Sequence, residues 1–455
     1  MVDFQTLGKT PLASSATLRS RDSLGIGNLR RPMNLLPGFR DFFPADCARR
    51  NYLLAQWREV ARRYGFVEFD GPMLEPVALY EKKSGGELVG QLFDFVDKGQ
   101  RHVTLRPEMT PTLARMVAAR ERDFKKPLKW FCVPQFFRYE KQQRGRLREF
   151  YQLNCDILGD ASPAADAELL AVLIDMLRVF GLGAEDFVVR ISDRRAWTQF
   201  ATTRGVAAER VPDFLAVIDK LERTAPEETE RKLAEFGLTL AAVRAFLADP
   251  AAEAAELRAI TDDLQARGLG AFVELDLTIV RGLAYYTGVV FEVFDRQKKE
   301  RALAGGGRYD QLLSLMSDGK VDLPALGFGM GDVVLGNLID DTPAARARME
   351  AWIAREQACE VYVVIAEEAR RAEALGLVQQ LRDAGRRTDF PLAAAKVGKQ
   401  FQTAEQLGAR VAILVGGEWP LVKVKTLATR EERVVAAAEC LAALELQASY
   451  FGSSR

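Results

Sequence analysis

Three strand-like segments follow one another along the chain, and they limit the fold more than any other feature of the sequence. The segments are HVTLRPE (102–108), KWFCVPQFFRYE (129–140) and REFYQLNCDILG (148–159), and we expect turns that contain proline or glycine between them. Strands joined without crossover helices pair in antiparallel fashion, because a parallel pair needs a crossover of a dozen or more residues. The sequence therefore predicts an antiparallel sheet.

Helical periodicity surrounds these strands. Apolar residues recur at intervals of three and four from Arg49 to Tyr64 and from Ala164 to Phe180, which predicts two amphipathic helices. Between about 195 and 270 alanine, glutamate, arginine and leucine recur with helical spacing, so we expect an inserted helical subdomain. Strand patterns return at FVELDLTIV and VVFEVFD, GGGRYD predicts a turn, and GFGMG leads into a helix.

The chain of 455 residues is too long for one core, since single cores stop growing at roughly 250 to 300 residues. We expect a flexible tail at 1–32, a sheet-based domain at 33–342, a linker helix at 343–358 and a second domain at 359–455. From EVYVVIA onward strands alternate with helices, which is typical of a small parallel α/β domain. For the first segment, a start codon assigned too early and a transit peptide are alternatives to a tail.

Composition indicates an ordinary globular protein. Apolar residues make up 48% and charged residues 28% of the chain, and the 63 basic residues balance 63 acidic ones, so net charge neither suggests nor excludes RNA. Five cysteines lie far apart without metal-ligand spacing. No apolar run approaches the roughly 20 residues that span a bilayer. We therefore expect a cytoplasmic protein with no membrane partner.

Charged and polar residues interrupt four otherwise apolar segments. They are LRPEMT (105–110), FRYE (137–140), YQLNCD (151–156) and VRGLAYYTG (280–288). A buried charge is costly unless it is paired, so any one segment alone indicates a structural ion pair. Four together on strands of one sheet instead favour a cleft that binds a charged, polar molecule.

These segments resemble the class II aminoacyl-tRNA synthetases, and specifically the histidine ligases. LPGFRDFFP (36–44) is similar to the opening segment of that family, FRYEKQQRGRLREF (137–150) to its motif 2, and the helix and strand that end at Pro72 to its motif 1. VRGLAYYTGVVFE and GGGRYD resemble two segments peculiar to the histidine ligases. The resemblance extends from about Leu36 to Val435.

The resemblance implies both a fold and a function. The fold is an α+β catalytic domain of the class II type with an antiparallel sheet and a helical insertion, followed by a C-terminal α/β domain like those that bind anticodons. The function is that of a histidine–tRNA ligase, which activates histidine with ATP and esterifies it to the 3′ end of tRNA(His). ATP is then a substrate and Mg²⁺ is expected, although no metal ligand can be named. Motif 1 implies a homodimer.

The chemistry of this reaction needs arginines. The histidine carboxylate attacks the α-phosphorus of ATP, so the site must hold two anions and stabilise added negative charge. By resemblance, Arg138 of motif 2 contacts the α-phosphate, and Arg281 lies between that phosphate and the carboxylate. The alternatives are structural ion pairs, of Arg138 with Glu140 and of Arg281 with Glu292. The resemblance extends the ATP site to Glu140, Gly329 and Gly331.

Recognition of histidine needs partners for its ammonium group and its imidazole. Asp156 and Tyr286 would bond the two ring nitrogens by resemblance, and Arg281 would approach the carboxylate. An imidazole held at both edges is distinguished from an isostere that lacks a nitrogen. We expect Tyr285 in the core rather than in the pocket. Three residues resemble the ammonium-binding set of the family: Glu108, Thr110 and Gln152.

Two regions are candidates for contact with tRNA. The loop KQQRGR (141–146) is basic, so we expect Arg144 and Arg146 to contact the tRNA acceptor end and ATP, with a solvated hairpin as the equal alternative. In the C-terminal domain, Lys399 belongs to the basic face that binding of phosphates requires. His102, the one histidine of the chain, is expected at the surface with no catalytic role.

One motif departs from the family pattern. Motif 3 of the family carries a Glu-Arg pair whose arginine binds the ATP γ-phosphate, but here Val333 and Val334 stand in these positions and no arginine follows within eight residues. Arg308, or a loop arginine with Mg²⁺, is the expected substitute. This loss favours a second candidate, the non-catalytic regulatory subunit of ATP phosphoribosyltransferase in histidine biosynthesis, and a third is an RNA-binding sensor. Arg281, motif 2 and the C-terminal domain favour the ligase.

Overall fold

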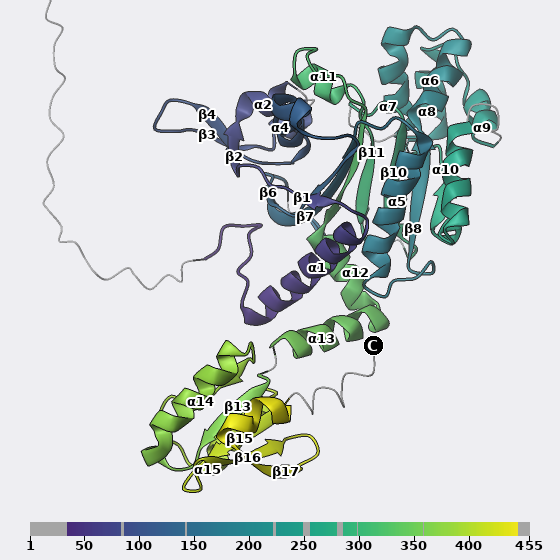
Figure 1. The fold of residues 1–455 in the computed structure, drawn as a ribbon. Coiled ribbons are helices and arrows are strands. Elements are labelled where there is room, and N and C mark those ends of the chain that lie inside the picture. The colour runs from purple at the N-terminus through teal and green to yellow at the C-terminus, as the bar shows by residue number, and fades with distance from the viewer. Residues whose placement is uncertain are drawn as a thin grey trace, which may run out of the picture.

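The computed structural model describes residues 34–82, 86–141, 143–221, 224–248, 255–279, 285–297, 299–357 and 359–444. The predicted tail at 1–32 and the candidate residue Arg281 lie outside these ranges. A large part built on a mixed sheet is followed along the chain by a smaller part with a sheet of its own (Figure 1). No helix among the described residues is long and apolar enough to cross a membrane.

The large sheet is mostly antiparallel, which confirms the prediction. β6 (Gln135–Phe137) pairs with the first residues of the strand that follows it. The two outermost strands pair in parallel with their neighbours. In spatial order the strands are β1 (Val67–Glu68), β5 (Leu128–Cys132), β7 (Glu149–Leu158), β12 (Ala325–Gly331), β11 (Ala304–Arg308), β10 (Val289–Asp295), β8 (Phe187–Asp193) and β9 (Val273–Leu275).

Two predictions about this region are wrong. GGGRYD is not a turn, because β11 includes its glycines and pairs with a strand on either side, β10 and β12. The segment between β4 (His102–Leu105) and β5 is not only a turn either, because it holds helix α4 (Thr110–Arg120). Proline at the second position of α4 is compatible with a helix, since a first-turn residue needs no N–H donor.

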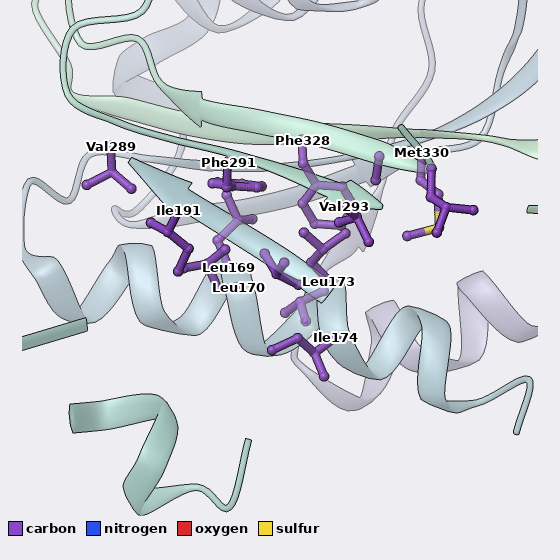
Figure 2. Close-up of a cluster of buried hydrophobic side chains, with 14 of the residues drawn as sticks. Leu169, Leu170, Leu173, Ile174, Ile191, Val289, Phe291, Val293, Phe328 and Met330 are labelled. Atoms are coloured by element: carbon purple, nitrogen blue, oxygen red, sulfur yellow. The ribbon is translucent and has the colours of Figure 1, made fainter. Parts of the chain in front are cut away.

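Helix α5 (Pro163–Arg178) covers one face of the large sheet (Figure 2). Successive side chains of a strand point to opposite faces, so the remaining residues of these strands point away from α5 and toward the candidate site. Helix α1 (Pro44–Arg63) packs beside α5 and buries Trp57 completely. The core between α5 and the sheet includes Leu169, Leu170, Leu173, Ile174, Ile191, Val289, Phe291, Val293, Phe328 and Met330.

Two further groups of elements complete the large part. A small sheet carries the elements before motif 2: β2 (Leu74–Pro76), α2 (Val77–Glu81), α3 (Gly86–Val89), β3 (Phe93–Val96), β4, α4 and η2 (Glu121–Asp123). The helical insertion is confirmed, and its elements are α6 (Arg194–Thr203), η3 (Ala208–Arg210), α7 (Val211–Ile218), α8 (Pro226–Ala234), α9 (Leu240–Ala248), α10 (Ala255–Ala266) and η4 (Gly270–Phe272). Trp197 anchors it, since its indole N–H donates to the Leu277 carbonyl at 2.6 Å.

The C-terminal sheet is mixed, so the prediction of a parallel domain is only partly right. The strand formed by Val361–Ile365 pairs in parallel on both sides, but the last two strands along the chain pair in antiparallel fashion, because the short connections before them have no room for a crossover helix. In spatial order its strands are β14 (Thr388–Asp389), β13 (Val361–Ile365), β15 (Val411–Val415), β16 (Leu421–Thr426) and β17 (Glu432–Ala436). The helices before this sheet in the chain are α11 (Leu312–Met316), α12 (Asp332–Asp341) and α13 (Pro343–Gln357). Those within the C-terminal part are η5 (Glu368–Arg370), α14 (Arg371–Asp383), α15 (Val397–Gln406) and η6 (Ala437–Glu439).

Candidate active site

The face of the large sheet that points away from α5 combines polar side chains with glycines. Gln152 and Asp156 project from this face of β7, and β12 pairs with β7 in a register that sets Gly327 opposite Asp156. A Cβ on Gly327 would lie 2.0 Å from Oδ1 of Asp156, and one on Gly329 would lie 2.4 Å from Nε2 of Gln152. Any larger residue at these positions would collide with the polar groups, so glycine in β12 makes room for them.

A tyrosine that the sequence did not single out orients Asp156. The hydroxyl of Tyr309 donates a hydrogen bond to Oδ1 of Asp156 at 2.5 Å, and both side chains are buried. Burial, followed by the nearby Asp156 charge, raises the pKa of the Tyr309 phenol well above its usual value. The phenol therefore keeps its proton and remains a donor, which fixes the carboxylate for a ligand.

Tyr285 and Tyr286 pack beside this pair. Their ring centroids lie 4.7 Å apart, and the ring of Tyr285 lies 6.1 Å from that of Tyr309. Tyr286 is 8% exposed and belongs to the same apolar cluster as Leu113 and Tyr309, whereas Tyr285 is only partly buried. The expectation that Tyr285, rather than Tyr286, lies in the core is therefore wrong. The pairing of the Tyr286 hydroxyl with imidazole remains a prediction.

Arg138 lies at the edge of this face with a fixed orientation. Its Nε donates to the Pro107 carbonyl at 2.9 Å, and its guanidinium carbon lies 5.3 Å from the centroid of the Phe150 ring. Its Nη1 is 4.0 Å from Oε1 of Glu140, at the outer limit of an ion pair, and Glu140 also pairs with Arg146. The alternative of a structural Arg138–Glu140 pair is thus weak.

The segment that carries Glu108 and Thr110 is held against motif 2 by Arg106. This buried arginine donates to Oδ1 of Asp70 at 2.7 Å and to the Gln135 carbonyl at 3.0 Å. Its own carbonyl accepts the N–H of Phe137 at 3.1 Å. The predicted ammonium-binding segment and the start of motif 2 are therefore neighbours, although about 30 residues separate them.

At motif 3 the structure places an acid and two valines where the family pattern has a cation. Asp332 is buried, its Oδ2 accepts from Arg40 at 2.9 Å, and its Oδ1 accepts the Tyr151 N–H at 3.0 Å. Burial raises the pKa of Asp332, and Arg40 opposes that rise. Arg40 also pairs with Glu149 at 3.3 Å. This network fixes the start of α12 to β7, and Val334 follows it with 8% exposure.

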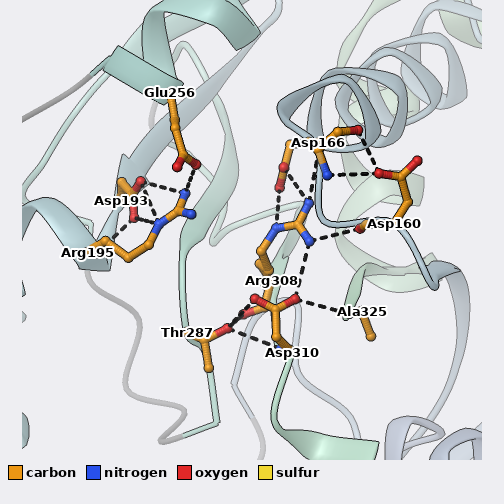
Figure 3. A network of polar contacts seen from close by, with 10 residues as sticks. Asp160, Asp166, Asp193, Arg195, Glu256, Thr287, Arg308, Asp310 and Ala325 are labelled. Carbon is orange, nitrogen blue, oxygen red and sulfur yellow. Dashed lines mark hydrogen bonds and ion pairs between the residues drawn. The ribbon is translucent and has the colours of Figure 1, made fainter. Parts of the chain in front are cut away.

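Arg308 has a structural role (Figure 3). It is 2% exposed and donates to Oδ2 of Asp166 at 2.6 Å, to Oδ1 of Asp310 at 3.2 Å, and to the carbonyls of Asp160 and Ser162. Burial alone would lower the pKa of the Arg308 guanidinium. The hydrogen bonds that it donates to Asp166 and Asp310, together with their negative charges, raise the pKa above its usual value. Because its donors point into the protein, the prediction that Arg308 replaces the motif 3 arginine is wrong.

The predicted tRNA contacts differ in their surroundings. In the motif 2 loop, Arg144 donates to Oε1 of Glu300 at 2.7 Å, and Arg146 pairs with Glu140. In the C-terminal part, Lys399 is exposed on α15. Next to it the buried amide of Gln400 bonds the backbone of Ile365, which fixes α15 to β13. His102 is exposed, as predicted, and its Nε2 lies 2.6 Å from Asp94.

The structure thus brings together side chains from three segments that are separate in the sequence. Glu108, Arg138, Gln152 and Asp156 border one face, with the glycines of β12 beneath them. Sequence reasoning missed three supporting residues, Arg40, Tyr309 and Glu300, because each acts through a partner far away in the chain. The placement of Arg281 lies outside the described residues.

Known proteins resemble this chain over most of its length. The family model "Histidyl-tRNA synthetase" matches residues 38–331, and the model "Anticodon binding domain" matches residues 360–446. The histidine–tRNA ligase of Opitutus terrae is 43% identical over 421 residues, which cover 87% of this chain and 94% of that protein. The chloroplastic/mitochondrial histidine–tRNA ligase of Arabidopsis thaliana is 36% identical and covers 87% of this chain and 83% of that protein.

Solved structures share the fold. The histidyl-tRNA synthetase of Nostoc sp. PCC 7120 aligns with a TM-score of 0.71 over 92% of this chain and 100% of that one, at 22% identity. An "ATP phosphoribosyltransferase regulatory subunit/histidyl-tRNA synthetase" of Bacillus halodurans aligns with a TM-score of 0.63 over 84% of this chain and 99% of that one, at 23% identity. Such low identities support the fold alone. The match of the family model to most of the chain, together with relatives at 36% and 43% identity, shows that the chain belongs to the histidyl-tRNA synthetase family.

Proposed function

We propose that the glycine-lined face of the large sheet is the active site of a histidine–tRNA ligase, an ATP-dependent enzyme that activates histidine and transfers it to the 3′ end of tRNA(His). The observation that carries this proposal is the placement of the Asp156–Tyr309 pair and Arg138 along one face. The alternative of a regulatory subunit is less well supported, because a histidine sensor has no use for an anticodon-binding domain at 360–446.

Asp156 is our candidate acceptor for one N–H of the histidine ring, and the Tyr286 hydroxyl is the candidate partner for the other nitrogen. Our candidates for binding the ammonium group are Glu108, Thr110 and Gln152. An apolar amino acid would offer no N–H to the buried Asp156 carboxylate, so its complex would lack the charge-assisted hydrogen bond that a histidine ring could form. Specificity would come from this penalty.

Arg138 is our candidate for the ATP α-phosphate. Its Nε is already bonded to Pro107, so the forked Nη groups are the donors left to face a phosphate oxygen as negative charge develops there. Arg281 keeps its proposed place on the other side of the phosphate, and Glu140, Gly329 and Gly331 complete the proposed ATP site.

Mg²⁺ is expected as the partner of the triphosphate. Within the described ranges, no three His, Cys, Asp or Glu side chains gather in a way that could hold a metal ion. This is compatible with Mg²⁺, which commonly keeps several waters and binds through one or two carboxylates together with substrate phosphates. Glu140 is the acid that we place beside those phosphates.

We assign tRNA contacts to Arg144 and Arg146 in the motif 2 loop and to Lys399 on α15. A homodimer through motif 1 is supported by apolar side chains that are exposed in that segment, Val67 at 63%, and directly after it, Met73 at 46% and Leu74 at 41%. Exposed apolar residues beside an open edge strand such as β1 favour association with another chain. We place the enzyme in the cytoplasm.

Histidine-dependent exchange of pyrophosphate into ATP tests the proposed function. The purified chain should catalyse this exchange with histidine and at least about 10²-fold less well with each other amino acid, because the other side chains do not present ring nitrogens to both Asp156 and Tyr286. Charging of tRNA(His) transcript should follow in the same preparation. Absence of exchange with histidine, or a preference for another amino acid, would contradict the proposal.

Replacing Tyr309 by phenylalanine should raise the KM for histidine about tenfold and leave the KM for ATP almost unchanged. The variant removes the hydrogen bond that orients Asp156, and bonds to a charged acceptor contribute roughly 1.5–3 kcal/mol. Tyr362→Phe is the matched control, because Tyr362 is also buried but lies in β13 of the C-terminal part. Equal histidine KM values for the two variants would remove Tyr309 from the proposed pocket.

A further inference from the structure

The missing motif 3 arginine leaves a defined place without a cation. Val334 lies in the first turn of α12, and a Cβ on Gly145 of the motif 2 loop would be 3.0 Å from its Cγ2. An arginine at position 334 would therefore emerge beneath this loop. The β- and γ-phosphates of ATP carry most of its negative charge, so a site for them without a second cation would be poorly compensated.

The loop after β10, of which the structure describes residues 296–297 and 299–302, borders the same place and is held there by hydrogen bonds. The buried carboxylate of Asp295 accepts the backbone N–H of Lys299 at 3.1 Å and that of Glu300 at 2.8 Å. Glu300, whose side chain is 2% exposed, then accepts from Arg144 at 2.7 Å and from Asn337 of α12 at 3.3 Å. The loop is thus tied both to the motif 2 loop and to α12.

Arg301 follows Glu300 and turns toward the motif 2 loop. Its Nη1 lies 3.5 Å from Oε1 of Gln143, and the side chain is exposed. Partial burial and the neighbouring Arg146 charge lower the pKa of the Arg301 guanidinium, while Glu140 acts in the opposite direction. Arg301 thus contacts the motif 2 loop at Gln143, while Arg146 of the same loop pairs with Glu140. An added anion would stabilise two guanidinium groups at one loop.

We propose that Arg301 binds the β,γ-phosphate end of ATP and so supplies the cation that Val334 cannot. Arg138 would hold the α-phosphate, and Arg146 and Arg301 would bracket the other end of the triphosphate. Arg144 is a poorer candidate, because its guanidinium is bonded to Glu300. The inference rests on the proposed function, since it requires ATP in this cleft.

The test compares Arg301→Gln with Arg296→Gln in the full-length protein. Arg296 belongs to the same loop, but it donates to the Ala184 carbonyl at 2.6 Å and pairs with Glu274 at 2.7 Å, away from the motif 2 loop. Arg301→Gln should raise the KM for ATP in histidine-dependent exchange tenfold or more. The KM for histidine and the inhibition constant of AMP, which lacks the β- and γ-phosphates, should change less than twofold. Arg301→Lys, which keeps the charge, should restore most of the ATP affinity, and Arg296→Gln should match the wild type.

Each other outcome has a distinct meaning. If the wild-type protein shows no histidine-dependent exchange, the proposed function itself fails. If the wild type is active and Arg301→Gln keeps its ATP KM within twofold, the inference is wrong and the function stands. A rise in the tRNA KM alone would assign Arg301 to nucleic acid, and an equal weakening of ATP and AMP would exclude a role at the β,γ-phosphates. Both results would overturn the proposal.

Discussion

Replacing Arg138 by alanine should lower the kcat of histidine-dependent ATP–pyrophosphate exchange about 10³-fold. The expected loss is large because negative charge grows on the α-phosphate as the carboxylate attacks, and a cation fixed before the reaction stabilises that charge without reorganising. The bond from Nε to the Pro107 carbonyl and the nearby Phe150 ring provide this fixed orientation. Since the interaction strengthens in the transition state, kcat should fall far more than the KM values change.

Two variants control for this result. Arg120→Ala removes an exposed arginine at the end of α4, whose pair with Asp123 lies at the surface, and should leave exchange unchanged. Arg138→Lys keeps the charge but loses the forked donors, so it should still lose more than tenfold in kcat. Circular dichroism of each variant verifies the fold. A kcat for Arg138→Ala within threefold of the wild type would remove Arg138 from the reaction.

The sequence allowed the face of the sheet to be predicted because strand alternation is a local property. In β7, Asp156 is the fourth residue after Gln152, an even step along the strand, so the two side chains share a face. The apolar residues between them face α5. The segment around Glu108 could be recognised as unusual, but its contact with motif 2 depends on Arg106, which bonds residues on either side of it in the chain.

Strand β11 shows why glycine-rich segments are misjudged. Glycine has a low preference for strands, so GGGRYD predicts a turn from the sequence alone. In the fold, hydrogen bonds from β10 on one side and β12 on the other supply the stability that glycine does not. A Cβ on Gly306 would lie 2.2 Å from the Gly327 carbonyl oxygen, so close packing of backbones requires the residue that weakens the local prediction.

Arg308 and Tyr309 show a second limit of sequence reasoning. These adjacent residues serve different regions, since Arg308 pairs with Asp166, 142 residues away, and Tyr309 bonds Asp156, 153 residues away. The end of β11 decides that Arg308 points into the protein and that Tyr309 supports the pocket. The periodicity of the sequence does not contain that information. For the same reason the arginines of motif 2 and the 296–302 loop could not be ranked as phosphate ligands before their partners were known.

Replacing Arg308 by methionine should destabilise the large part of the protein by about 3–5 kcal/mol, the usual cost of leaving a buried charge without its partner. The variant would leave the carboxylate of Asp166, which lies on α5 and is 4% exposed, without its cationic partner. The carbonyls of Asp160 and Ser162 would also lose their donor. Urea unfolding followed by tryptophan fluorescence measures the effect, because four of the five tryptophans precede residue 358 and only Trp419 lies in the C-terminal part.

The matched control is Arg267→Met, which removes an arginine that pairs with another carboxylate of α5, Glu168, but at the surface, where such pairs contribute roughly 0–1 kcal/mol. The double variant Arg308→Met with Asp166→Leu should recover much of the lost stability, since it removes the stranded charge as well as its partner. A loss for Arg308→Met no larger than that of the control would mean that the network in Figure 3 is not what holds β11 to α5.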